Sequence, residues 1–250
     1  MSKKSHLQSV SAAIFCLIGT AAASESITAS PFAFYERANQ NIVIDGVSTK
    51  YALGVLGIQL EKEFNNFITA SAKVGYGQID DQKTSFSGAT FYGQVIGSYI
   101  STKGTFKLME QDNITLFGTF GLSQKELKAP NLLGTRNGLD LTGKAHTTIR
   151  ATDLALGVDY ALTKSISVQL SGGVSRWQIK SNAVAYYSSS GLSATARKDI
   201  DSKGTDPIFA VSLETNKPNH NFAAKISNRS LGSQADTSIT SGELTYSYQF

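Results

Sequence analysis

The last nine residues of the chain alternate strictly between apolar and polar side chains. Leu244, Tyr246, Tyr248 and Phe250 share one face of an extended segment, and the polar residues between them share the other. Successive side chains of a β-strand point to opposite faces, so this pattern predicts a strand with one apolar face. Such a strand needs partners, because an unpaired edge leaves backbone N–H and C=O groups free.

The same alternation recurs through the chain and predicts about ten strands. No segment shows a good helical period, and none approaches the length of an apolar transmembrane helix. In the strand over 148–162, Leu154, Leu156 and Val158 oppose Asp153 and Asp159. The expected strands are 31–39, 51–61, 67–79, 89–101, 113–126, 148–162, 165–180, 205–215, 221–230 and 242–250.

The connections between these strands alternate between long and short, as in an up-and-down barrel with one looped end. Phe106, Leu108 and Met109 suggest that the unassigned connection over 102–112 continues a strand. A soluble β-sandwich is the alternative fold, but its connections need not alternate in length. Long or polar connections are expected at 40–50, 80–88, 127–147, 181–204 and 231–238, and short ones at 62–66, 163–164 and 216–220.

The first 23 residues have the features of a secretory signal peptide. Lys3 and Lys4 precede a short apolar stretch over 10–18, and alanines at 21–23 offer a cleavage site. Cys16, the single cysteine, lies inside this segment. We therefore expect a mature domain over 24–250 with neither a disulfide nor a cysteine metal site.

Composition agrees with either a soluble protein or a membrane barrel. The mean hydropathy is −0.11, and a polar lumen gives a membrane barrel a similar value. The net charge of +4 is mild and no dense basic run occurs, which argues against nucleic-acid binding.

Two motifs resemble those of small bacterial outer-membrane β-barrels: the terminal strand ending in Phe250 and the turn over 159–164. The resemblance implies an antiparallel up-and-down transmembrane barrel of about ten strands, with 8–12 possible, located in the cell outer membrane. It implies that Leu244, Tyr246, Tyr248 and Phe250 form the signal read by the barrel assembly machinery. It also implies surroundings of lipid and lipopolysaccharide.

The expected faces of the strands direct charges of both signs into the lumen. We interpret these charges as a network that fills the interior, because side chains largely fill a barrel of this size. A narrow channel whose lining selects ions is the alternative. The expected lumen residues are Lys73, Asp153, Asp159, Glu214, Lys225, Arg229 and Glu243.

Catalysis at the barrel rim is a second alternative. Omptin proteases are also ten-stranded and carry acidic pairs and an Asp–His pair, and Asp80 and Asp81 could supply one acidic pair. The segment 181–204 has acidic residues but no histidine to match them. A lipid A deacylase would need a His–Ser pair, which the sequence around His146 lacks. With His220 far away in the sequence there is no metal-ligand spacing, so we expect a non-catalytic protein without a cofactor or metal.

The polar connections are the other candidate for function. The segment 183–197 is rich in Tyr and Ser, which suits adaptable recognition at a surface. We expect Tyr99 and Trp177 to belong to the aromatic belts at the membrane interfaces. Basic residues that could meet lipopolysaccharide phosphates are Arg176, Lys180, Arg197 and Lys198.

Overall fold

The computed structural model describes residues 27–248 except 45, 87, 190–191, 218–219 and 232–236. The predicted signal peptide over 1–23 and the terminal Phe250 lie outside the described residues. Within the described part, no helix is long and apolar enough to cross a membrane.

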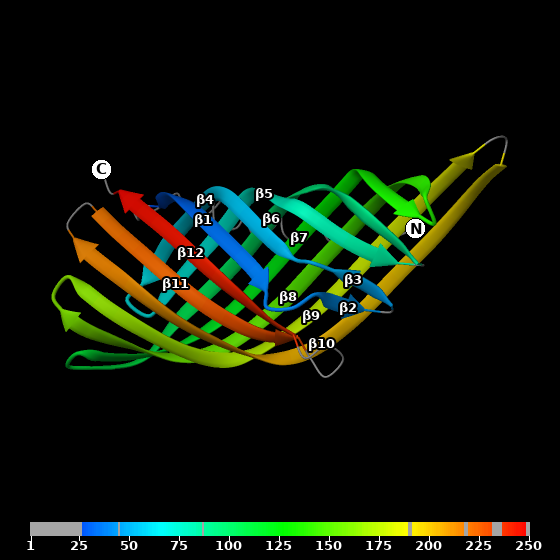
Figure 1. Cartoon of the computed structure of the whole chain (residues 1–250). Helices are drawn as coiled ribbons and strands as arrows, with labels where there is room; N and C mark the ends of the chain where they lie inside the picture. The colour runs from blue at the N-terminus through cyan, green and yellow to red at the C-terminus, as the bar shows by residue number, and fades with distance from the viewer. Residues whose placement is uncertain are drawn as a thin grey trace, which may run out of the picture.

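The described chain forms one antiparallel sheet (Figure 1). The segments with alternating apolar and polar residues form strands. In each such strand one face lies toward the interior of the barrel and the other toward the exterior. The strands are β1 (Thr28–Ala38), β2 (Ile42–Ile44), β3 (Val47–Thr49), β4 (Ala52–Asn65), β5 (Ile68–Phe86), β6 (Ala89–Gln111), β7 (Ile114–Arg136), β8 (Leu139–Thr163), β9 (Ile166–Ser189), β10 (Leu192–Lys217), β11 (His220–Leu231) and β12 (Thr237–Tyr248).

Ten of the described strands close into a ring. β1 pairs with β4 on one side and with β12 on the other, where Phe34 lies opposite Glu243. The closed barrel of about ten strands expected from the sequence is therefore confirmed. β2 and β3 form a hairpin, and in the part of the chain that the structure describes it pairs with the ring through β5 alone. Closure removes the free edges that a bilayer could not satisfy.

An apolar band surrounds the exterior of the ring. In β8, Leu154, Leu156, Val158, Tyr160 and Leu162 are all exposed. These alternate positions span nine residues, close to the length that a tilted strand needs to cross a bilayer. The same face is apolar in β9, β10 and β11, so the expected faces of these strands are confirmed. Their exposed residues include Leu170, Val174, Phe209, Val211, Leu213, Phe222 and Ile226.

Two of the predicted long loops are wrong, because the strands continue through them. β7 and β8 meet at Asn137 and Gly138, whose φ angles of 51° and 77° suit a two-residue hairpin of type I′. β9 and β10 stay paired through 181–204 and extend farthest in the upper right of Figure 1. Beyond the apolar band their exterior face is polar, which makes the composition look like that of a loop. We call the part of β7–β10 formed by 124–152 and 176–206 the extension.

The predicted loops at 40–50 and 80–88 are also largely strand, whereas the 102–112 region follows the expectation. β2 and β3 occupy most of the first loop, and β5 and β6 continue through most of the second. β6 runs through Phe106 and Leu108 to Gln111, so the continuation of that strand is confirmed. Only residues 112–113 separate β6 from β7, so this connection is as short as the others expected at that end.

The alternation in the strand over 89–101 predicts Phe91, Val95 and Tyr99 outside and Gln94 and Ser98 inside, and for β6 this prediction is wrong. Phe91, Val95 and Tyr99 are buried inside, whereas Gln94 and Ser98 are exposed. The interior of the extended end is itself apolar, so apolar side chains there point inward and not toward lipid. Trp177 is buried in the same way and donates a hydrogen bond to Asp206. The expected aromatic belt therefore contains neither Tyr99 nor Trp177.

Candidate functional site

The barrel encloses a cavity of about 320 Å³. The half nearest the extended end has apolar walls, to which the β2–β3 hairpin adds Ile42, Ile44 and Val47. The other half is polar and charged. Apolar lining of the first half comes also from Ile79, Val95, Leu127, Leu132, Ile149, Trp177, Ile179 and Ile200.

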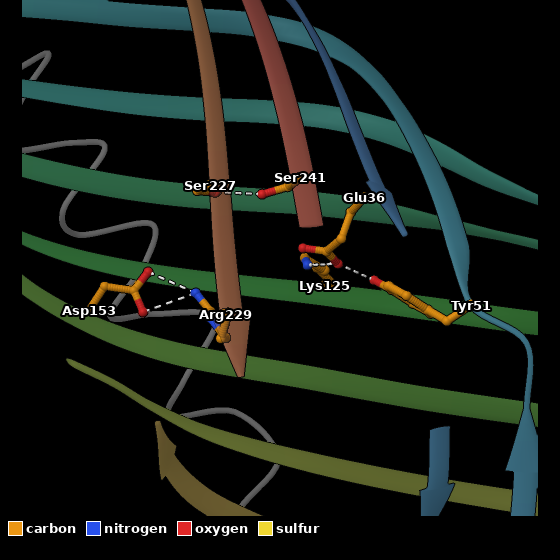
Figure 2. Close-up of polar contacts among 7 residues, drawn as sticks. All are labelled: Glu36, Tyr51, Lys125, Asp153, Ser227, Arg229 and Ser241. Carbon is orange, nitrogen blue, oxygen red and sulfur yellow. Dashed lines mark hydrogen bonds and ion pairs between the residues drawn. The ribbon is translucent and has the colours of Figure 1, made fainter. Parts of the chain in front are cut away.

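Three ion pairs among the described residues cross the interior. Lys73 of β5 pairs with Glu243 of β12, and Lys125 of β7 pairs with Glu36 of β1. Figure 2 shows the second of these pairs together with a third, in which the Arg229 guanidinium of β11 donates to both carboxylate oxygens of Asp153 of β8 at 3.1 Å. None of these three pairs joins neighbouring strands of the ring, so the side chains of each pair reach across the lumen.

Glu36 is the centre of the most buried of these contacts. Its carboxylate accepts hydrogen bonds from the Tyr51 hydroxyl and from the Lys125 ammonium group. The Lys125 and Glu36 side chains are only 9% and 10% exposed. Phe34 stacks on Tyr99 with ring centroids 5.5 Å apart, and the Lys125 ammonium lies 5.4 Å from the Phe34 centroid. Packing and charge pairing therefore hold this layer together.

The structure brings five of the seven predicted lumen residues to the cavity wall: Lys73, Asp153, Lys225, Arg229 and Glu243. Asp159 and Glu214 share the inward faces of β8 and β10 but lie nearer the short turns.

Sequence reasoning missed Glu36, Lys125 and Lys103, which also line the cavity. The position of Lys125 follows from the alternation in β7, where Phe120 and Leu122 point outward, so this signal was available. Lys103 lies in the connection over 102–112, for which the alternation predicts no strand face, and the strand over 31–39 does not alternate clearly enough to place Glu36.

The four predicted lipopolysaccharide contacts do not form one cluster. Arg176, Lys180 and Arg197 share the exterior face of the extension, whereas Lys198 lies on the opposite face, across from Ala183. Lys180 lies 3.2 Å from an oxygen of Asp201, and Arg197 lies 3.1 Å from an oxygen of Asp199.

Lys180 already has Asp201 as its ion-pair partner. Hydrogen bonds from Gln178 and Lys180 hold the pKa of Asp201 below its ordinary value, so this carboxylate stays ionised. Of the three on the exterior face, Arg176 has neither a hydrogen bond nor an ion pair among the described residues.

The candidate catalytic residues are scattered. His146 contacts Glu126 at 3.0 Å on the exterior of the extension, and His220 contacts the Tyr246 hydroxyl at 2.8 Å near a short turn. Asp201, an acidic residue of the segment 181–204, faces the exterior, whereas Asp206, just beyond that segment, faces the interior. The side chains of Asp80 and Asp81 lie outside those described. Among the described residues, no group of three or more His, Cys, Asp or Glu side chains could hold a metal.

Comparison with known proteins identifies the fold. No protein-family model and no curated protein matches this sequence. Among solved structures, the translocator domain of the autotransporter NalP from Neisseria meningitidis matches with a TM-score of 0.51 at 14% identity, over 98% of each chain. The protein is an outer-membrane β-barrel by fold. The exposed apolar band is therefore the surface that faces lipid.

Other solved barrels match this one at lower scores. The outer membrane protease OmpT from Escherichia coli has a TM-score of 0.49 at 8% identity, over 90% of this chain and 96% of that one. The COG4313 outer membrane channel from Pseudomonas putida F1 has a TM-score of 0.42 at 11% identity, over 92% and 97%. At these identities the similarity concerns the fold alone.

Proposed function

We propose that this barrel is non-catalytic, is closed to passive ion flow, and acts at the cell surface through its extension. The observation that supports closure is that Lys73–Glu243, Lys125–Glu36 and Arg229–Asp153 each bridge strands that are not neighbours. Bridged charges of both signs obstruct a lumen that side chains already largely fill. Function then falls to the extension, where the paired strands β9 and β10 project farthest.

The absence of catalysis in this proposal is supported by the placement of the histidines. His146 lies on the extension and His220 near a short turn at the other end, so they cannot act on one substrate together. Turnover of a lipid or a peptide that disappears in a His146→Ala variant would contradict the proposal and favour a hydrolase at the rim.

The barrel purified from outer membranes is expected to show no discrete openings in a planar bilayer. Removing one bridge with Lys73→Ala and Glu243→Ala should widen the lumen and produce openings, because two of the groups that cross it are lost. The Lys107→Ala and Glu110→Ala variant is the control, since that pair is exposed near a short turn. Openings in the unaltered barrel that change when Arg229 is neutralised would instead identify a selective channel.

We also propose that lipopolysaccharide phosphates bind on the exterior of the extension, around Arg176. Arg176 lies opposite Thr205 of β10 and Thr152 of β8, so Lys203 and Arg150 are its diagonal neighbours. Diagonal neighbours of this kind lie within reach of long side chains. Val174, one exterior position away, belongs to the apolar band, so the three cations border the lipid. Guanidinium groups suit phosphate well because they donate paired hydrogen bonds.

Replacing Arg150, Arg176 and Lys203 together with glutamine should weaken binding of lipopolysaccharide vesicles by about tenfold or more, since several charge-assisted hydrogen bonds are lost. The binding constant is measured by vesicle flotation at two salt concentrations, and the difference should shrink at high salt. Lys107→Gln, which removes one positive charge at the opposite end of the barrel, is the control. Equal binding by the triple variant and the control would refute this site.

A further inference from the structure

We propose that the interior cavity is a binding site for an amphipathic anion, a molecule with an apolar chain and one negatively charged head. The chain would occupy the apolar half of the cavity, and the head would lie against Lys225 and Lys103. This inference goes beyond the proposed function, which concerns the exterior of the extension.

The walls of the apolar half suit a hydrocarbon chain. Val47 of β3, Val95 of β6 and Leu132 of β7 are buried and face this space from three strands, with Ile179 of β9 beside them. The volume of about 320 Å³ lies at the lower end of the range of about 300–1,000 Å³ typical of small-molecule sites. A medium-length chain is therefore a better fit than a long lipid.

The polar half of the cavity has more basic than acidic side chains. Its described lining contains five cations, Lys73, Lys103, Lys125, Lys225 and Arg229, against three anions, Glu36, Asp153 and Glu243. Each of the three anions already has a cation as its partner. Glu243 pairs with Lys73, Glu36 with Lys125, and Asp153 with Arg229.

Lys225 and Lys103 are the two cations left over. In the part of the chain that the structure describes, neither forms an ion pair or donates a side-chain hydrogen bond, and each repels the other. Three acids act on Lys225 through their charge. Glu243 and Asp153 are engaged by Lys73 and Arg229, and Glu214 lies nearer the short turns without a hydrogen bond to Lys225. An anionic head placed here would relieve the repulsion and supply the missing acceptor.

The acidic groups beyond this point would hold such an anion in place. Glu61, Asp159 and Glu214 lie nearer the short turns than Lys225 does, and the charge of Lys103 acts on both glutamates. Their combined charge would repel an anion that moved deeper into the barrel. The arrangement therefore favours a site that retains its ligand over a pore that passes it.

Trp177 allows the binding to be measured directly. It is the single tryptophan of the sequence and it lines the cavity. The full barrel, purified from outer membranes and placed in phosphatidylcholine vesicles, is titrated with decanoate while the Trp177 emission is recorded. We expect a saturable change with decanoate. Decanol and decyltrimethylammonium, which have the same chain, should bind at least about tenfold more weakly.

Two variants test which residues bind the charged head of the ligand and which bind its apolar chain. Lys225→Gln should weaken decanoate about tenfold and leave decanol unchanged, whereas Lys144→Gln, exposed on the exterior, should change neither. Ala145→Phe, which fills the apolar half, should weaken both ligands and tests the site even if Lys225→Gln fails to assemble. Equal affinity for decanoate and decanol, an unsaturable signal, or unchanged binding in Ala145→Phe would each overturn the proposal. None of these outcomes depends on lipopolysaccharide binding or on conductance.

Discussion

A Glu36→Gln variant is expected to lose about 3–5 kcal/mol of folding free energy, the typical effect of breaking a buried ion pair by removing one partner. The glutamine can still accept a hydrogen bond from Tyr51. The Lys125 ammonium, however, would remain buried against Phe34 with its carboxylate partner gone. Urea-induced unfolding of the barrel in lipid vesicles measures the change.

Two further variants separate charge from packing. Glu36→Gln combined with Lys125→Met should recover much of the loss, because neither charge is then left unpaired. The Lys107–Glu110 pair is exposed, and Glu110→Gln should cost about 1 kcal/mol or less. A Glu36→Gln loss no larger than that of Glu110→Gln would mean that water reaches the Lys125 ammonium freely.

A Gly57→Ala variant is expected to lose about 3 kcal/mol, at the upper end of the usual cost of overpacking. A Cβ atom at this position would lie 2.2 Å from the carbonyl oxygen of Val74 and 2.7 Å from Cε1 of Phe32. Both distances are shorter than side chains tolerate, and the first involves backbone that cannot simply rotate away. The yield of assembled barrel and its unfolding free energy should both fall.

Gly54→Ala in the same strand is the matched control. No atom lies within 4 Å of the Cβ that alanine would add there, so stability should change by less than about 1 kcal/mol. Equal stability of the two variants would show that β4 and β5 shift apart without cost. That result would contradict the expectation that the close contact between Phe32 and Gly57 leaves no room for a Cβ atom.

The same pairing of an interior ring with a glycine recurs around the barrel. A Cβ on Gly157 would lie 2.4 Å from the Phe117 ring, and one on Gly204 would lie 2.5 Å from the Trp177 ring. In each case the glycine stands on the strand beside the aromatic residue. Because glycine has no Cβ atom, each of these large rings can pack closely against the neighbouring strand of the barrel wall.

Much of the barrel wall was predictable from the sequence because the alternation is local. The exterior faces of Leu154, Val174 and Val211 follow from side chains that change direction at every residue. The lengths of the strands were harder, since beyond the lipid a strand no longer needs apolar exterior residues. Asn137–Gly138 was an available signal of a tight hairpin inside the segment interpreted as a loop.

The interior was predictable only in part. Alternation placed Lys73, Asp153 and Arg229 on inward faces, but it could not say which charges would meet. It also misjudged β6, because apolar Phe91 and Val95 point into the barrel where its interior is apolar. The local pattern shows that alternate residues are apolar. Whether such a face contacts lipid or packs in the barrel interior depends on the tertiary structure around it.

The sequence by itself thus determined that this chain forms strands with one apolar and one polar face, since that alternation depends on neighbours along the chain. It also determined that the strands close into a barrel, since an open strand edge has no hydrogen-bond partners in lipid. Only the tertiary structure decided that Glu36 meets Lys125, 89 residues away, and that Lys73 meets Glu243, 170 residues away. Those contacts depend on how the strands are staggered when the ring closes. The apolar cavity and its two spare cations, Lys103 and Lys225, are consequences of that closure.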